Sequence, residues 1–290
     1  MKLRIKLLLS VAIAIAACVY YYVTIPAINI HSSGFWLFII SLVIALTLLC
    51  SLKKLRYGIA IKEIRSFQIG FVAVIVLFII YGVGTVLSSP IVNANRYHQL
   101  LPVQEGTFTE DIAEVDYNEI PLLDKSSATL LGNRKMGSLI DMVSQFEVSS
   151  LYTQINYQNK PVRVTPLVYA SPIKWLTNMS EGIPAYIMID MTTQDTECVR
   201  LLEGSYIRYS QAEYFNRNIY RHLRFRYPTY IFDQLSFEID EEGTPYWICP
   251  VKKFNIGLFG GQTIGKVVLC NAITGDTTCY NVEDCPQWVD

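Results

Sequence analysis

Three long apolar runs in the first third of the chain constrain its fold more than any other feature. Residues 7–25, 34–52 and 69–87 contain no Asp, Glu, Lys or Arg, and each approaches the length of about 20 residues that crosses the hydrocarbon core of a bilayer. Runs this long without a charge are typical of spanning helices rather than of buried core helices. The mean hydropathy of +0.29 is also high for an ordinary soluble domain. The sequence therefore predicts a membrane domain, residues 1–89, with three transmembrane helices and the lipid bilayer as its first partner.

The basic residues predict which side of the membrane each segment faces. Residues 24–33 contain no Lys or Arg, whereas five lie between residues 53 and 65 beside a single acid, and three precede the first run (Lys2, Arg4 and Lys6). Cytoplasmic connections are enriched in Lys and Arg. We therefore expect a multi-pass protein of a bacterial cell membrane, with its N-terminus in the cytoplasm and residues 90–290 outside.

The charge of the outer region excludes one class of partner. Residues 91–290 carry sixteen Lys and Arg against twenty-four Asp and Glu. Binding to phosphate backbones needs net positive charge, so no nucleic-acid partner is expected.

Cleavage after the first run is the alternative to a spanning first helix. The first 18 residues have the basic start and apolar core of a signal peptide, and "IAAC", ending at Cys18, resembles a lipoprotein cleavage box. The apolar run continues past Cys18 through "VYYYVTIP", which favours an uncleaved span. Either outcome leaves the large C-terminal region on the same side of the membrane.

The cysteines and histidines do not form a metal-binding pattern. Five of the seven cysteines lie in the outer region (Cys198, Cys249, Cys270, Cys279 and Cys285), where an exported domain can form disulfides. Five is an odd number, so at least one is unpaired or paired between chains. With no C-x-x-C and only His31, His98 and His222, the usual zinc spacing is missing, and no cofactor is predicted.

The outer region begins with an acidic segment. Residues 90–150 are expected to be a linker followed by a short helix at 137–146, "GSLIDMVSQF", whose apolar residues fall on one face. The acids of the linker do not follow the EF-hand pattern, so a solvated face is the better interpretation.

A short motif occurs twice in the outer region. "SEGIPAYIMID" (180–190) matches "EEGTPYWICPV" (241–251) at an offset of 61 residues. Glu-Gly predicts a turn with glycine at positive φ, and the proline begins a strand where its missing N–H costs least. The match predicts two related α+β units, residues 151–209 and 210–290.

The acidic residues of the second copy have two interpretations. Asp240, Glu241 and Glu242 are expected to form the turn. A weaker alternative is a Ca²⁺ site, which neighbouring carboxylates on a strand favour little because successive side chains alternate in direction.

Between the two copies lies a basic segment. Ser210 and Glu213 fit a capping box, which predicts a helix over 211–225 that ends before Pro228. On such a helix three arginines share a face, and a fourth follows it (Arg217, Arg221, Arg224 and Arg226). They either pair within this acidic region or bind an anion: a phosphate, a sugar acid, a lipid headgroup or an acidic partner.

The second unit resembles PepSY-type extracytoplasmic modules. The resemblance rests on "GTPYWICPV" and "GKVVLCNAITGDTTCYNV", an aromatic strand after a glycine turn and then a strand with a "TGD" turn. It covers about residues 163–203 and 228–282, and the first unit departs from it with "TTQD" in place of the TG turn. The resemblance implies a non-catalytic binding or inhibitory module. The whole chain is similar to membrane-anchored proteins of Gram-positive bacteria, and its abrupt end, "CPQWVD", suggests a longer native protein.

The sequence thus favours a membrane-anchored extracytoplasmic binding or regulatory module. Its partners would be an envelope polymer or a membrane protein. The alternatives are a structural or assembly subunit of a membrane complex and, less favoured, an envelope enzyme. G-x-S-x-G, H-E-x-x-H and P-loop patterns are missing, no catalytic residue is assigned, and Cys249 with His222 is the one nucleophile pair left open. Spans without charged residues disfavour a transporter.

Overall fold

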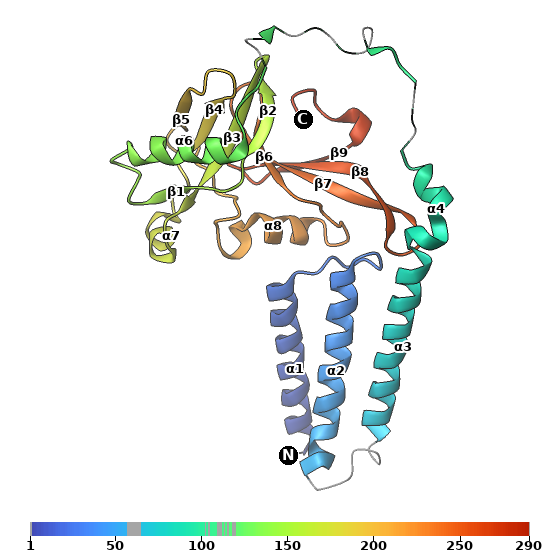
Figure 1. Ribbon diagram of the computed structural model, residues 1–290. Helices are drawn as coiled ribbons and strands as arrows, with labels where there is room; N and C mark the ends of the chain where they lie inside the picture. Colours follow the sequence, from blue (N-terminus) through green and yellow to red (C-terminus); the bar gives the residue numbers. More distant parts are fainter. Residues whose placement is uncertain are drawn as a thin grey trace. The chain divides into compact units, whose positions relative to one another are not determined.

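The computed structural model describes residues 2–56, 65–101 and 120–289, together with residues 103, 105–108, 112, 114, 116 and 117 (Figure 1). Parts of the basic connection and of the acidic linker predicted above therefore lie outside the described residues. The chain divides into two compact units. The helical unit comprises residues 1–102, 227–231 and 253–263, and the sheet unit comprises residues 103–226, 232–252 and 264–290.

Four helices make up most of the helical unit: α1 (Lys2–Thr24), α2 (Ser33–Arg56), α3 (Arg65–Leu87) and α4 (Pro90–His98). Two segments are long and apolar enough to cross a membrane, Ser33–Ser51 of α2 and Arg65–Leu87 of α3, with mean hydropathies of 2.4 and 2.6. The first predicted span is helical, but its described apolar stretch, Val11–Thr24, is shorter than a span. Two of the three predicted spans are therefore long and apolar enough to cross a membrane.

Helices α2 and α3 approach closely at a glycine. A Cβ atom added at Gly70 would lie 1.9 Å from Thr47 Oγ1, so only glycine permits this approach. Nearby, the hydroxyls of Ser51 and Ser66 are 3.2 Å apart and share a hydrogen bond. Small residues and interhelical hydrogen bonds are the contacts that hold helices together in an apolar solvent.

The sheet unit begins with a helix and a sheet. Helix α6 (Lys125–Gly137) precedes β1 (Phe146–Val148), β2 (Thr153–Tyr157) and β3 (Lys160–Tyr169), and then α7 (Pro172–Asn178), β4 (Ala185–Asp190) and β5 (Thr196–Arg200). The strand order is β1-β3-β4-β5, with β2 also pairing with β3, and these pairs are antiparallel.

A second helix and sheet follow, and here, unlike α7 in the first sheet, no helix lies between the strands, whose residues 236–281 are all described. The 3-10 helix η3 (Phe215–Arg217) and α8 (Ile219–Arg226) precede β6 (Ser236–Ile239), β7 (Pro245–Ile256), β8 (Gly260–Asn271) and β9 (Thr277–Asn281), and the 3-10 helix η4 (Val282–Asp284) comes last. The strand order is β6-β7-β8-β9. The predicted α+β class is therefore confirmed.

Two helix boundaries differ from the sequence expectation. Residues 138–145 are mostly turns rather than a helix, because the nearby helix starts earlier and ends at Gly137. Asp124 caps this helix, α6, by accepting the N–H of Ser127 (2.7 Å). In the turns the apolar residues separate, with Phe146 buried and Ile140 89% exposed. The helix expected at 211–225 begins only at Ile219.

Aromatic residues join the two sheets in one core. The Tyr186 hydroxyl of β4 donates to the carbonyl of Gly243 (3.0 Å), and its ring meets that of Phe237 edge-on at 6.1 Å. Phe237 in turn packs edge-on against Trp247 of β7 at 5.4 Å. All three side chains are almost completely buried, so the two sheets share a hydrophobic core.

The glycines of the duplicated motif adopt the conformation expected of them. Gly182 and Gly243 have φ of +103° and +80°, and strands β4 and β7 follow directly. The two glycines thus form turns of similar backbone conformation, as predicted.

A second correspondence connects the hairpins β4–β5 and β8–β9. In each turn an acceptor side chain, Asp190 or Asn271, bonds the N–H groups two and three residues later at 2.8–3.0 Å. The fifth residue of each turn, Gln194 or Gly275, has positive φ. Residues 190–200 therefore correspond to residues 271–281, so β4 corresponds to β8, as it does by position in the strand order. The Glu-Gly-x-Pro motif gives a different correspondence, because it aligns β4 with β7.

The tip of the β7–β8 hairpin, residues 253–263, belongs to the helical unit. The Ser88 hydroxyl, at the C-terminal end of α3, accepts the N–H groups of Leu258 (2.9 Å) and Phe259 (3.1 Å) and donates to Gly84 O (2.6 Å). Ser88 is 3% exposed. One buried side chain thus satisfies two backbone groups of the tip.

Further contacts hold the same tip. The Tyr97 hydroxyl donates to Ser88 O (2.7 Å) and accepts the N–H of Gly261 (3.1 Å). The His31 ring stacks on Phe254 at 5.2 Å, and its Nδ1 lies 2.7 Å from Leu258 O. The segment after α1 also bonds residues 227–231, through Ile28 N to Pro228 O and Asn29 Nδ2 to Thr229 O.

Candidate functional site

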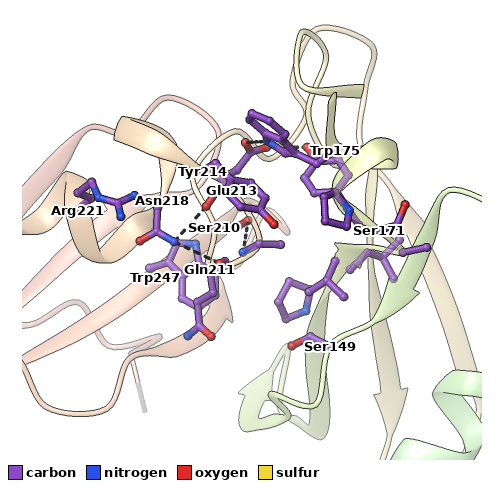
Figure 2. A pocket seen from close by; sticks show the side chains of 17 residues that line it. Ser149, Ser171, Trp175, Ser210, Gln211, Glu213, Tyr214, Asn218, Arg221 and Trp247 are labelled. Carbon is purple, nitrogen blue, oxygen red and sulfur yellow. Dashed lines mark hydrogen bonds between the residues drawn. The ribbon is translucent and has the colours of Figure 1, made fainter. Parts of the chain in front are cut away.

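A cavity of ≈ 630 Å³ in the sheet unit is the best candidate for a functional site. Figure 2 shows its walls. One wall is formed by the C-terminal half of β3, the start of α7 and Ser149; the other is formed by residues 210–214, Asn218, Arg221 and Trp247. Its volume falls within the range of about 300–1,000 Å³ that is usual for small-ligand sites.

A buried carboxylate fixes the aromatic side of the cavity. Glu213 is 2% exposed, and its two oxygens accept the Tyr169 hydroxyl (2.6 Å) and the Trp175 indole N–H (2.8 Å). Burial, and then the hydrogen bond to Glu213, raise the pKa of Tyr169 well above its usual value, so its hydroxyl remains a donor. Glu213 therefore orients the two aromatic rings.

The oriented indole belongs to an aromatic wall. The Trp175 ring lies 4.6 Å from the ring of Tyr214 and 6.1 Å from that of Phe215. Tyr214 is 46% exposed. Elsewhere in the lining, the indole N–H of Trp247 donates to the carbonyl of Tyr209 (2.8 Å), which fixes that ring as well.

Three serine hydroxyls are among the cavity's side-chain donors. Ser149, Ser171 and Ser210 line it, and each hydroxyl oxygen accepts a backbone N–H at 3.1–3.3 Å. A serine hydroxyl has one proton to donate as well, and that proton is not used in these bonds. The Asn218 amide instead bonds the carbonyls of Gln211 (3.3 Å) and Glu213 (3.1 Å) and so shapes the loop.

The predicted basic cluster is divided by the structure. Arg221 is the one of the four arginines that lines the cavity, and its Nη1 donates to Phe215 O (3.1 Å). Arg217 lies in η3 and donates to the carbonyl of Met179, while Arg224 and Arg226 lie in the last turn of α8. The prediction that Arg217, Arg221 and Arg224 share one helix face was therefore wrong, because the chain before Ile219 is not α-helical.

The predicted capping box was wrong for a related reason. Ser210 accepts the N–H of Ala212 at 3.1 Å rather than capping a helix, and Glu213 is bonded to Tyr169 and Trp175.

The acidic residues of the second Glu-Gly-x-Pro motif form a turn. The Asp240 carboxylate accepts the N–H groups of Glu242 (3.1 Å) and Thr244 (2.7 Å), which confirms the turn interpretation for this residue. Asp240 and Glu242 also line a second cavity of ≈ 380 Å³ with Asp276. Among the residues that the structure describes, no group of three or more His, Cys, Asp or Glu side chains is arranged to hold a metal ion.

The nucleophile pair left open by the sequence is buried. Cys249 is 0% exposed, and burial raises the pKa of its thiol well above the usual value. His222 Nε2 lies 2.7 Å from Gly275 O, and its ring lies 4.5 Å from that of Tyr209. Burial lowers the pKa of His222. A buried thiol in this state is not an accessible nucleophile.

One spacing with catalytic associations does border the cavity. Ser171 and Lys174 are separated as in S-x-x-K. The Ser171 hydroxyl is the N-cap of α7, where it accepts the backbone N–H of Lys174 (3.3 Å). Lys174 does not line the cavity, so the geometry gives this serine a capping role.

Sequence reasoning missed the cavity itself. Its walls come from segments up to about one hundred residues apart, Ser149 to Trp247, and no short motif joins them. The available signal was compositional, since aromatic residues are concentrated before each Glu-Gly-x-Pro motif, in "YASPIKWLTNM" and "YPTYIFDQLSFEID".

Comparison with known proteins gives no match: no family model, no curated protein and no solved structure is significantly similar to this chain.

Proposed function

We propose that this protein is a membrane-anchored extracytoplasmic binding module, and that its ligand occupies the cavity between β3, α7 and residues 210–221. The observation that carries the proposal is the cavity's construction. Glu213, itself buried, holds Trp175 and Tyr169 in place, and rigid walls of this kind reduce the cost of ordering a site on binding.

The membrane part of the proposal rests on length, hydropathy and charge. α2 and α3 are long and apolar enough to cross a membrane, and α1, with its basic start, is the third span of the proposal. The excess of Lys and Arg at the start of α1 and over residues 53–65 favours a cytoplasmic N-terminus and an external sheet unit.

The two similar sheets support a duplicated module, and the PepSY-type resemblance implies that such a module binds rather than catalyses. We take the helix and meander α6–β5 and the helix and meander α8–β9 as copies of one module, in keeping with the PepSY-type resemblance. The ligand cavity lies where the two copies meet, since β3 belongs to the first and Trp247 to the second.

Two experiments on the full-length chain test this proposal. Protease added to intact bacterial cells that express it should remove residues 103–290 without lysis. Digestion only after lysis would refute the orientation.

The second experiment tests the cavity. A soluble extract of the bacterial envelope should raise the unfolding temperature of the purified protein, since a ligand that binds only the folded state stabilises it. Ala212→Trp places an indole in the cavity and should abolish that rise. An equal rise in the variant would show that the ligand binds elsewhere, and a stoichiometric protein partner in the extract would favour the assembly role instead.

A further inference from the structure

We propose that the ligand of this cavity is a saccharide, such as a glycan segment of the cell envelope. This inference rests on the function proposed above, because it names the ligand class of the same site. Charge, hydrogen-bonding capacity, the aromatic wall and the state of the neighbouring strands each favour a saccharide.

The charges of the cavity favour a ligand without net charge. One acid and one base line it, Glu213 and Arg221. The acid's oxygens already accept two donors, at 2.6 and 2.8 Å, and Arg221 donates to a backbone carbonyl. Neither a phosphate nor an ammonium group would find the clustered opposite charge that binds such ions. The site proposed here therefore differs from the anion site predicted from four arginines, which stays a prediction.

The hydrogen-bonding groups match a ligand rich in hydroxyls. The hydroxyls of Ser149, Ser171 and Ser210 already accept backbone N–H groups, so each is oriented with a proton to donate. Gln211 adds a side-chain amide to the lining. Saccharide oxygens accept such protons, and saccharide hydroxyls donate to amide oxygens.

The aromatic wall suits the apolar faces of a sugar ring. A pyranose ring exposes C–H groups on its faces, and these pack on aromatic rings. Tyr214 offers such a surface, since it is 46% exposed and is backed by Trp175 at 4.6 Å. Because Glu213 fixes Trp175, the wall loses little conformational entropy when a ligand binds.

The strand edges beside the cavity argue against a peptide bound as an added strand. Such a peptide needs unpaired backbone groups at a sheet edge. Here β1 pairs with β3, the N–H of Ser149 donates to Pro166 O (3.0 Å), and that of Ala170 donates to Gln145 O (3.0 Å). The backbone groups at this wall are therefore already paired with one another.

The test uses the full-length protein in nanodiscs of phosphatidylglycerol and phosphatidylethanolamine, because sugar-headed detergents would compete for the site. Isothermal titration measures binding of chitotetraose and cellotetraose, with tetra-alanine as the peptide probe. Tyr214→Ala is compared with Tyr220→Ala, whose side chain has nearly the same exposure, 45% against 46%, but does not line the cavity.

We expect at least one of the two oligosaccharides to bind, and Tyr214→Ala to weaken its affinity by about tenfold or more, while Tyr220→Ala leaves it unchanged. Binding should also change the fluorescence of Trp175 and Trp247, which line the cavity. The same change should remain in the variants Trp36→Phe and Trp288→Phe.

Three outcomes overturn the saccharide. The first is that neither oligosaccharide binds. The second is that only tetra-alanine binds and that its binding depends on Tyr214. The third is that an oligosaccharide binds Tyr214→Ala as well as it binds the wild type. In the first two cases an envelope extract that still stabilises the wild type, but not Ala212→Trp, would leave the binding module standing with another ligand. If the extract also fails to stabilise the wild type, the proposal of a binding module is refuted as well.

Discussion

Replacing Ser88 by alanine should loosen the tip of the β7–β8 hairpin. The Ser88 hydroxyl is the acceptor for two backbone N–H groups, those of Leu258 (2.9 Å) and Phe259 (3.1 Å), and it is 3% exposed. In Ser88→Ala both donors lose their partner while the surrounding backbone stays in place.

The magnitude follows from the cost of an unsatisfied donor. Each buried N–H left without a partner costs about 1–3 kcal/mol, which gives about 2–6 kcal/mol for two. Water can enter beside a part-buried tip, so we expect the lower end, about 2 kcal/mol, and the amides should then exchange their hydrogens roughly thirtyfold faster.

Hydrogen exchange followed by mass spectrometry on peptides that contain Leu258 and Phe259 measures this directly. Ser89→Ala is the matched control, because the neighbouring Ser89 makes no side-chain cap hydrogen bond. Exchange that rises by less than about threefold over this control would refute the reasoning, since even one lost bond of about 1 kcal/mol should exceed that change.

A second variant examines the same contact from the other side. Tyr97→Phe removes the donor to Ser88 O and the acceptor for the N–H of Gly261. Because Tyr97 bonds Ser88 itself and both residues hold the same tip, the two effects on exchange should not be additive in the double variant.

Three further predictions concern packing, turns and pH. Gly70→Ala should lower the unfolding temperature, because its Cβ would meet a side chain of α2 at 1.9 Å, whereas Gly82→Ala, with no atom within 4 Å, should leave it unchanged or raise it. In chemical denaturation Gly204→Ala should cost about 1 kcal/mol for its positive φ, and Gly182→Ala about 3 kcal/mol or more, since its Cβ would also lie 2.5 Å from a backbone oxygen. Burial lowers the pKa of His222 below 6.5, so the folded state binds fewer protons than the unfolded state. Its contribution to stability is then complete above pH 6.5 and is lost as the pH falls through the lowered pKa. A wild type that loses no more stability than His222→Gln between pH 7.5 and 5 would contradict this.

Local signals predicted the parts of the fold that depend on local physics. The segments Ser33–Ser51 and Arg65–Leu87 follow from charge-free composition alone. The positive φ of Gly182 and Gly243 follows from a four-residue motif. In both cases the determining residues lie within one element.

Long-range partners explain what the sequence could not predict. Glu213 sits where a capping box expects it, but its oxygens bond Tyr169 and Trp175, 44 and 38 residues away. Two neutral donors inside a core are stronger partners for a carboxylate than one exposed N–H, so the helix starts later, at Ile219. The cavity depends on the same contacts, and it was hidden from sequence reasoning for the same reason.

The long-range contacts of the segment after α1 also set an order for biogenesis. Asn29 bonds a carbonyl 200 residues further along the chain, and His31 one 227 residues further. At a synthesis rate of about 5–20 residues per second, His31 waits roughly 10–45 s for its partner to be made. If the sheet unit is external, that partner must also cross the membrane first. Helices inserted at the start of translation therefore remain without their final packing until export of the chain is nearly complete, and a nascent chain stalled before residue 253 would leave them available to quality-control proteases.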